Sequence, residues 1–120
     1  MSDHGNNSAQ ILEERLRLGA GFGEEDRGRV LEILSALRRH LAHWRPEQVD
    51  LEISVKNRDG AEQKVTLEAW LPGWPSLVVS STDPDLDHAL AEVRKDLIRR
   101  IEDRKAKSGP RSRAARREHL

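Results

Sequence analysis

The chain has 120 residues, 36% hydrophobic and 35% charged, with a formal net charge of zero, which fits one small domain. The absence of Cys excludes disulfides, thiolate metal sites and a cysteine nucleophile. No segment approaches the ~20 apolar residues of a membrane span, and residues 1–10 lack the apolar core of a signal peptide, so we expect a cytoplasmic protein without membrane contact.

The zero net charge hides a segregation of charge along the chain. Residues 94–117 hold eleven Lys or Arg against three acids, a net charge of +8. Residues 1–93 carry ten basic and seventeen acidic residues, a net charge of −7. A basic end on an acidic body indicates binding to a polyanion.

The N-terminal part begins with a polar segment, residues 1–9, which we expect to be a disordered tail. Leucines at even spacing between Ile11 and Leu18 then predict a first strand. Three glycines at alternate positions in residues 19–23 match phosphate-binding loops only weakly, because no Gly-Lys-Ser/Thr follows. We interpret them as the turn from strand to helix.

A first amphipathic helix follows, opened by the acids at 24–26 and stopped by Pro46. Its apolar stripe, with a spacing of three or four, consists of Val30, Ile33, Leu34, Leu37, Leu41 and Trp44.

Residues 49–81 show the period of two that is typical of half-buried strands. Strands are predicted over 49–56, 64–71 and 76–81. Asp59-Gly60 and the Pro-rich residues 72–75 are turn signals between them. The three strands therefore form an antiparallel meander.

A second helix is announced by Asp83-Pro84, an N-cap followed by proline at the first helical position. Its apolar stripe consists of Leu86, Leu90, Val93, Leu97 and Ile101. Gly109-Pro110 ends the ordered part, and residues 108–120 are predicted to be a disordered basic tail.

These elements predict an α+β domain over residues 10–107, in the order β-α-β-β-β-α. Two helices pack on one face of a mainly antiparallel four-stranded sheet, and the other face stays in solvent.

Catalytic and metal-binding patterns are weak in this sequence. The five histidines lack zinc-site spacing, and the aspartates at 83, 85 and 87 suit a helix cap better than a calcium loop. No Ser/His/Asp set or paired carboxylates stand out. We therefore expect no enzyme, no cofactor or metal, and no small-molecule substrate.

Basic residues on the two helices are the strongest functional signal. A helical wheel places Lys95 and Arg99 opposite the apolar stripe, with the other cations at its borders. If the helices lie side by side, one basic stripe can contact phosphates. The candidate RNA-binding residues are Arg38, Arg39, Arg94, Lys95, Arg99, Arg100, Arg104 and Lys105.

Two alternatives stand beside this interpretation. The helix cations can be an ordinary solvated surface paired with neighbouring acids such as Asp96 and Glu102, although the four arginines of the tail favour binding. Trp70 and Trp74 can stack on bases, but a structural role is favoured. In that structural role, Trp70 covers the open face of the sheet and Trp74 packs against the Pro-rich turn.

Over about residues 11–107 the chain resembles the ribosome hibernation-promoting factors, also called the ribosome-associated inhibitor or sigma-54 modulation family. Residues 85–90, Asp-Leu-Asp-His-Ala-Leu, are similar to the family's Asp-Met-Tyr-x-Ala-Ile. Residues 97–101, Leu-Ile-Arg-Arg-Ile, are similar to its Leu-Glu-Arg-Gln-Ile/Leu. Arg99 matches the family arginine, and Lys105 a basic position one turn later. The chain departs from the family at three positions: Ala36 and Asp96, where it commonly has Lys, and Asp87, where it has Tyr.

The resemblance implies a cytoplasmic translation inhibitor that acts in stress or stationary growth. Such a factor binds the small ribosomal subunit and its 16S rRNA, in the channel used by mRNA and tRNA. It further implies the short form, without the C-terminal domain with which long members pair ribosomes. The alternatives are a protein-interaction module that docks an acidic partner, and a double-stranded-RNA-binding domain, which shares the helix-on-sheet shape.

Overall fold

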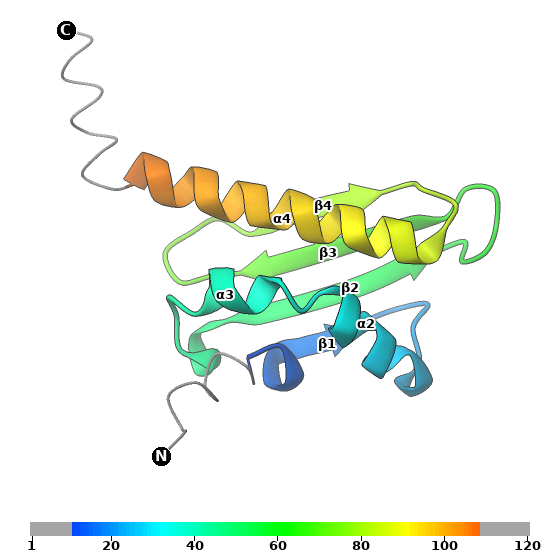
Figure 1. Ribbon diagram of the computed structural model, residues 1–120, viewed down its shortest axis with the longest axis horizontal. Helices are drawn as coiled ribbons and strands as arrows, with labels where there is room; N and C mark the ends of the chain where they lie inside the picture. Colours follow the sequence, from blue (N-terminus) through cyan, green and yellow to red (C-terminus); the bar gives the residue numbers. More distant parts are fainter. Residues whose placement is uncertain (1–10, 109–120) are drawn as a thin grey trace, which may run out of the picture.

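A mixed four-stranded sheet organises the protein, as seen in a computed structural model that describes residues 11–108 (Figure 1). Its strands, in spatial order, are β1 (Leu16–Leu18), β2 (Asp50–Lys56), β3 (Lys64–Trp70) and β4 (Leu77–Ser81). β1 runs parallel to β2, whereas β2–β3 and β3–β4 are antiparallel pairs. The predicted α+β class is confirmed, and the sheet contains one parallel pair.

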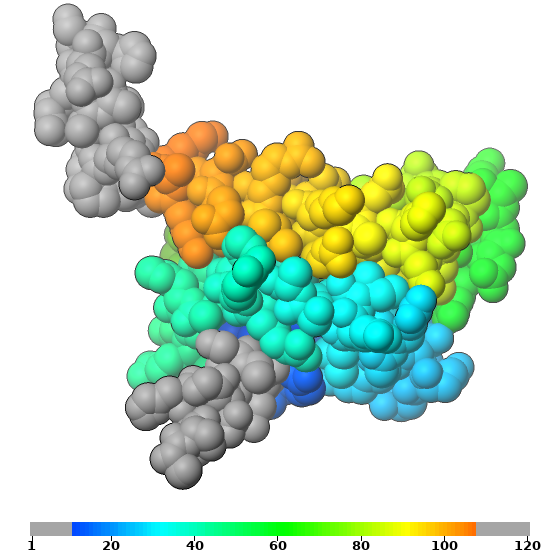
Figure 2. Space-filling view, in the orientation of Figure 1, coloured from blue at the N-terminus to red at the C-terminus, as the bar shows by residue number. Residues whose placement is uncertain are grey.

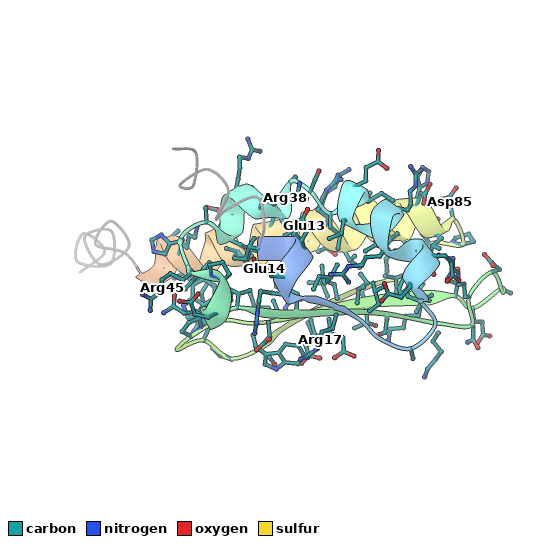
Figure 3. All side chains as sticks on the ribbon, turned by 90° about the horizontal axis from the view of Figure 1, so that it is seen from below. Glu13, Glu14, Arg17, Arg38, Arg45 and Asp85 are labelled. Carbon is teal, nitrogen blue, oxygen red and sulfur yellow. The ribbon has the colours of Figure 1, made fainter. Side chains whose placement is uncertain are left out.

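Helices cover one face of this sheet. α4 (Leu86–Ser108) packs across β3 and β4, with α2 (Arg27–Ile33) and α3 (Leu37–Leu41) beside it. Two short 3-10 helices, η1 (Glu24–Asp26) and η2 (Pro46–Gln48), flank α2 and α3 in the chain. Figure 3, turned by 90°, shows the helices on one side of the sheet and the other side open.

The core lies between the helices and the sheet. Every second residue of β2 and β3 is buried, as the period of two predicts: Leu51, Ile53, Val55, Val65, Leu67 and Ala69. The facing residues of α4 are Leu90, Val93, Leu97 and Ile101. Burial of each large side chain contributes about 1.5–3 kcal/mol, so this core fixes which sides of α4 stay in solvent.

The strand predicted over residues 11–18 is wrong in its first part. Residues 11–15 are helical, and β1 begins only at Leu16. Ile11 and Leu12 are buried from the helical turn, and Leu16 is buried from the start of β1. Because evenly spaced leucines fit either structure, the alternation alone misled the prediction.

The single helix predicted between Glu24 and Pro46 is divided into α2 and α3. Residues 34–36 form turns, and Leu37 N donates to Leu34 O, three positions back instead of four. Both leucines are fully buried, so the tighter turn keeps them in the core. The break also frees the carbonyl oxygen at the end of α2 for a partner from α4.

α4 begins at Leu86, later than the predicted start at Pro84. Asp85, not Asp83, caps it, because Asp85 Oδ1 accepts a hydrogen bond from the backbone N–H of His88 at 3.1 Å. Asp83 Oδ1 accepts from the backbone N–H of Asp85 at 2.8 Å. These carboxylates therefore shape the helix start, in line with the cap interpretation.

The glycine-rich residues 19–23 form the predicted turn between β1 and the helices. Gly21 has a φ of +90°, and a Cβ there would lie 2.2 Å from Val55 O. Only glycine fits this backbone. Val55 N donates to Ala20 O at 2.9 Å, so the turn continues along β2 beyond the end of β1.

The predicted tails, residues 1–9 and 108–120, lie outside the described residues, apart from Ser108, which ends α4. Across residues 11–108, no helix combines the length and apolar character needed to cross a bilayer.

Candidate nucleic-acid interface

α4 presents its basic residues on two flanks, because its apolar stripe faces the sheet. Arg94 and Lys105 lie on the flank toward α2 and α3. Arg100 and Lys107 lie on the flank toward β4. In Figure 2, α4, yellow to orange, forms a long ridge against the cyan surface of α2 and α3. The basic stripe predicted from the sequence is therefore divided along the helix axis.

Arg94 connects α4 to α2. Its Nη1 donates to Ile33 O, at the end of α2, at 2.9 Å, and the residue is half-buried. A charged donor satisfies the carbonyl that the break between α2 and α3 leaves free. Arg94 thus has a structural role that the helical wheel did not reveal.

Arg38 and Arg39, adjacent on α3, lie in different environments. Arg38 Nη2 donates to Glu13 Oε2 at 2.5 Å, and its side chain is 28% exposed. Figure 3 shows the two labelled residues next to each other. Arg39 is exposed and has no ion-pair partner among residues 11–108. The Arg38–Glu13 pair escaped sequence analysis because Glu13 was expected in a strand.

Glu102 contacts two basic side chains, His40 and Lys105, on the flank toward α3. Its Oε2 lies 2.7 Å from Nδ1 of His40 and accepts from Lys105 Nζ at 3.5 Å. The hydrogen bond with His40, assisted by Lys105, lowers the pKa of Glu102 below its usual range. Glu102 therefore offsets the charge of Lys105, which reduces its attraction for phosphate.

Two tryptophans pack below the C-terminal half of α4. The rings of Trp44 and Trp74 meet edge to face, with centroids 5.2 Å apart and an interplanar angle of 90°. Arg104 lies 5.7 Å from the Trp74 ring centroid, and Lys105 lies 5.7 Å from that of Trp44. Trp74 is partly buried and packs against the core, as a structural role requires.

A groove of about 430 Å³ lies between the C-terminal half of α4 and the start of the edge strand β4. Its lining residues, here called the α4 groove, are Leu77, Asp96, Arg99, Arg100, Asp103, Arg104 and Lys107. Arg99 Nη2 donates to Asp96 Oδ1 at 2.8 Å. Arg100 and Lys107 form no ion pair within residues 11–108. Four cations thus face two carboxylates, and three of the cations, Arg100, Arg104 and Lys107, have no carboxylate partner within residues 11–108, although Arg104 lies against the Trp74 ring.

Arg99, Arg100 and Arg104 of this groove are predicted from the sequence, whereas Lys107 is not. The helical period contained the signal, because Lys107 follows Arg100 by seven residues and so shares its side of α4. Lys95 is exposed on the solvent side of the same helix and has no ion-pair partner in the described part of the chain.

The histidines of the described residues have local partners. His40 binds Glu102, the ring of His43 lies 5.3 Å from that of Trp44, and His88 Nδ1 lies 3.8 Å from Asp83 Oδ2. No group of three or more His, Asp or Glu side chains in residues 11–108 is arranged to hold a metal ion.

Neither a family model nor a curated protein matches this sequence. Among solved structures, the N-terminal domain of Protein Y from Thermus thermophilus is similar, with a TM-score of 0.54. The match covers 74% of this chain and 93% of that one, at 19% sequence identity. At this identity the likeness establishes a shared fold.

Proposed function

We propose that the protein is a ribosome-associated translation inhibitor that binds the 16S rRNA of the small subunit in the channel for mRNA and tRNA. The α4 groove carries this proposal, because Arg100 and Lys107 are cations without a carboxylate partner within residues 11–108. The fold, shared with the Protein Y domain, and the resemblance of residues 85–90 and 97–101 to the hibernation-promoting factors support the same assignment.

The proposed RNA contacts centre on the α4 groove and extend over the solvent side of α4 and α3. The residues with the most available charge are Arg39, Lys95, Arg100, Arg104 and Lys107, and Arg99, which is paired with Asp96, lies among them. Arg38, Arg94 and Lys105 remain proposed contacts, but each already binds an acceptor within the protein. Their loss should therefore weaken RNA binding less than loss of the groove cations.

Phosphate contacts of this kind give binding that depends steeply on salt. Each neutralised phosphate releases counterions, and log K falls against log salt with a slope of about −0.7 to −0.9 per contact. Selectivity for one place on the ribosome would come from the shape of folded rRNA more than from its base sequence.

Asp96 is the departure from the family with the clearest structural consequence. Where the resemblance implies Lys, this carboxylate binds Arg99 and removes part of the charge of the groove. The basic residues between 111 and 117 lie outside the described residues. We propose that they supply attraction that the folded surface has lost.

Sedimentation with purified small subunits tests the proposed location. We expect the protein to pellet with empty subunits and to be released when mRNA and tRNA fill the channel. Arg100→Glu/Lys107→Glu should abolish pelleting, whereas Arg45→Glu, at an exposed residue outside the groove, should not. Equal pelleting with empty and filled subunits would contradict a site in the channel.

The α4 groove also contains Leu77, so an acidic peptide is the second candidate ligand. Affinity capture after nuclease treatment separates the two. Recovery of one acidic protein without rRNA would favour the peptide, and competition by duplex RNA against intact subunits would favour a free double-stranded-RNA binder.

A further inference from the structure

The open face of the sheet, opposite the helices, is sorted by charge along its strands. At one end, Glu52 of β2 lies directly opposite Glu68 of β3, and Arg17 Nη2 is 3.5 Å from Glu52 Oε1. Arg17 also lies 5.5 Å from the ring centroid of Trp70, which is partly exposed on this face. The other end of the same two strands is basic.

Lys56 and Lys64 form this basic end. They are directly opposite each other in the β2–β3 ladder, and both are exposed. Like charges at opposed positions destabilise a sheet. Neither lysine forms an ion pair with a residue between 11 and 108. The repulsion between the two ammonium groups is therefore uncompensated within the described part of the protein.

Protection of a sheet edge does not explain these lysines. Proteins often place Lys on edge strands to prevent pairing with other chains. Here β2 lies between β1 and β3, and β3 lies between β2 and β4. Val65, next to Lys64, is paired with Ser81 of β4, and Val55, next to Lys56, bonds to Ala20. Both lysines thus belong to interior strands.

A concave surface of about 250 Å³ lies at this pair. It is lined by Ala20, Ser54, Val55, Lys56, Lys64 and Thr66. Ser54 is directly opposite Thr66, and neither hydroxyl has a hydrogen-bond partner among residues 11–108. Two ammonium groups and two hydroxyls are donors that suit a phosphate. This volume is about that of eight water molecules in the liquid, which is enough for a phosphate group.

Glu52 borders the Ser54 side of this surface, because Glu52 Oε2 and Ser54 Cβ lie 2.6 Å and 3.3 Å from the same point beside Gly19, whereas the two lysines lie at the opposite end. Glu52 precedes Lys56 by four residues in the same strand. At ~3.3 Å per residue this separation is about 13 Å, which exceeds the Debye length of about 8 Å at physiological salt. Glu52 and Glu68 thus carry the negative charge of this face, and Lys56 and Lys64 carry its positive charge at the other end of the same strands.

We infer that Lys56, Lys64, Ser54 and Thr66 form a phosphate-binding site for a nucleic-acid backbone. This site lies on the face opposite α4, so the protein would contact a polynucleotide from both sides of its sheet. This site can be tested without the ribosome, because all of its residues belong to this one domain.

Backbone amide NMR of the full chain with a short oligouridylate tests the site. We expect shifts at residues 54–56 and 64–66 that Lys56→Gln/Lys64→Gln abolishes. An uncharged methylphosphonate oligomer of the same sequence should leave those amides unchanged. The control variant is Arg17→Gln/Arg45→Gln, which also removes two positive charges but outside the site. Arg17 lies on the same face of the sheet. The control should therefore keep the shifts. Shifts confined to α4, or equal shifts with the uncharged oligomer, would overturn the inference.

Inorganic phosphate, titrated in parallel, separates a polynucleotide from free phosphate. Saturation of these amides by the oligouridylate at the lower concentration supports the backbone site, and saturation by free phosphate at an equal or lower concentration overturns it. Arg100→Glu/Lys107→Glu distinguishes this test from that of the proposed function. In this variant the shifts at 54–56 and 64–66 should persist even though small-subunit binding is lost.

Discussion

Arg94 of α4 donates a hydrogen bond to the carbonyl oxygen of Ile33, the last residue of α2, at 2.9 Å. This contact joins two helices through residues that are 61 positions apart in the sequence. It occupies an acceptor that a continuous helix would have used internally, and so it stabilises the break between α2 and α3.

Arg94→Met should therefore destabilise the fold. The methionine keeps much of the apolar stem but removes the charged donor, and an unsatisfied carbonyl costs about 1–3 kcal/mol. Urea unfolding measures this loss. Lys95→Met, at the exposed neighbour, should change the free energy of unfolding by less than about 0.5 kcal/mol. Equal effects of the two substitutions would contradict a structural role for Arg94.

Two glycines should respond to alanine in opposite directions. Gly21 has a φ of +90° and no room for a Cβ, so Gly21→Ala should destabilise by more than about 1 kcal/mol. Gly28 lies within α2, and a Cβ there meets nothing within 4 Å. Gly28→Ala should stabilise by about 0.4–1 kcal/mol. Urea unfolding of both variants checks the contrast, and a neutral Gly21→Ala would show that the turn adopts another backbone.

Asp26 should make stability depend on acid pH. Arg58 donates to both carboxylate oxygens at 2.9 Å, and this lowers the pKa of Asp26 from 3.8 to about 2. Because the folded pKa lies below the unfolded one, the stabilisation is present above about pH 4 and is lost as pH falls toward 2.

The difference in unfolding free energy between the wild type and Asp26→Asn should therefore shrink between pH 4 and pH 2. Carboxyl NMR should also show the pKa of Asp26 rising in Arg58→Gln. A pKa that stays unchanged in this variant would exclude Arg58 as its cause.

Lys56→Gln/Lys64→Gln should raise thermal stability at low salt. The substitution removes a repulsion between opposed residues, and a gain of about 0.2–1 kcal/mol corresponds to a rise in Tm of about 1–6 °C. The gain should vanish at high salt, where the charges are screened. A lower Tm, or a gain that salt does not affect, would mean that the two ammonium groups do not repel each other across the strands.

The parts of this fold that the sequence predicts are those that local periodicity determines. The alternation in β2 and β3 and the stripe of α4 each identify a buried face within one element. The helical turn at residues 11–15 was missed because its two buried residues, Ile11 and Leu12, are adjacent and too few to show a period.

The candidate site was predicted in part for a related reason. The helical wheel identifies which cations leave the core, but it contains no information on their partners. Arg94 and Arg38 are held by residues 61 and 25 positions away, and such contacts exist only in the folded protein. The groove beside β4 likewise depends on where the sheet edge lies under α4.

The central claim is that the cations of the α4 groove neutralise rRNA phosphates. The most direct test is the slope of log K against log salt for purified small subunits, compared between the wild type and Arg100→Gln/Lys107→Gln. Loss of two contacts should make this slope shallower by about 1.4–1.8, with no change in Arg17→Gln/Arg45→Gln. An unchanged slope in the groove variant would contradict the claim.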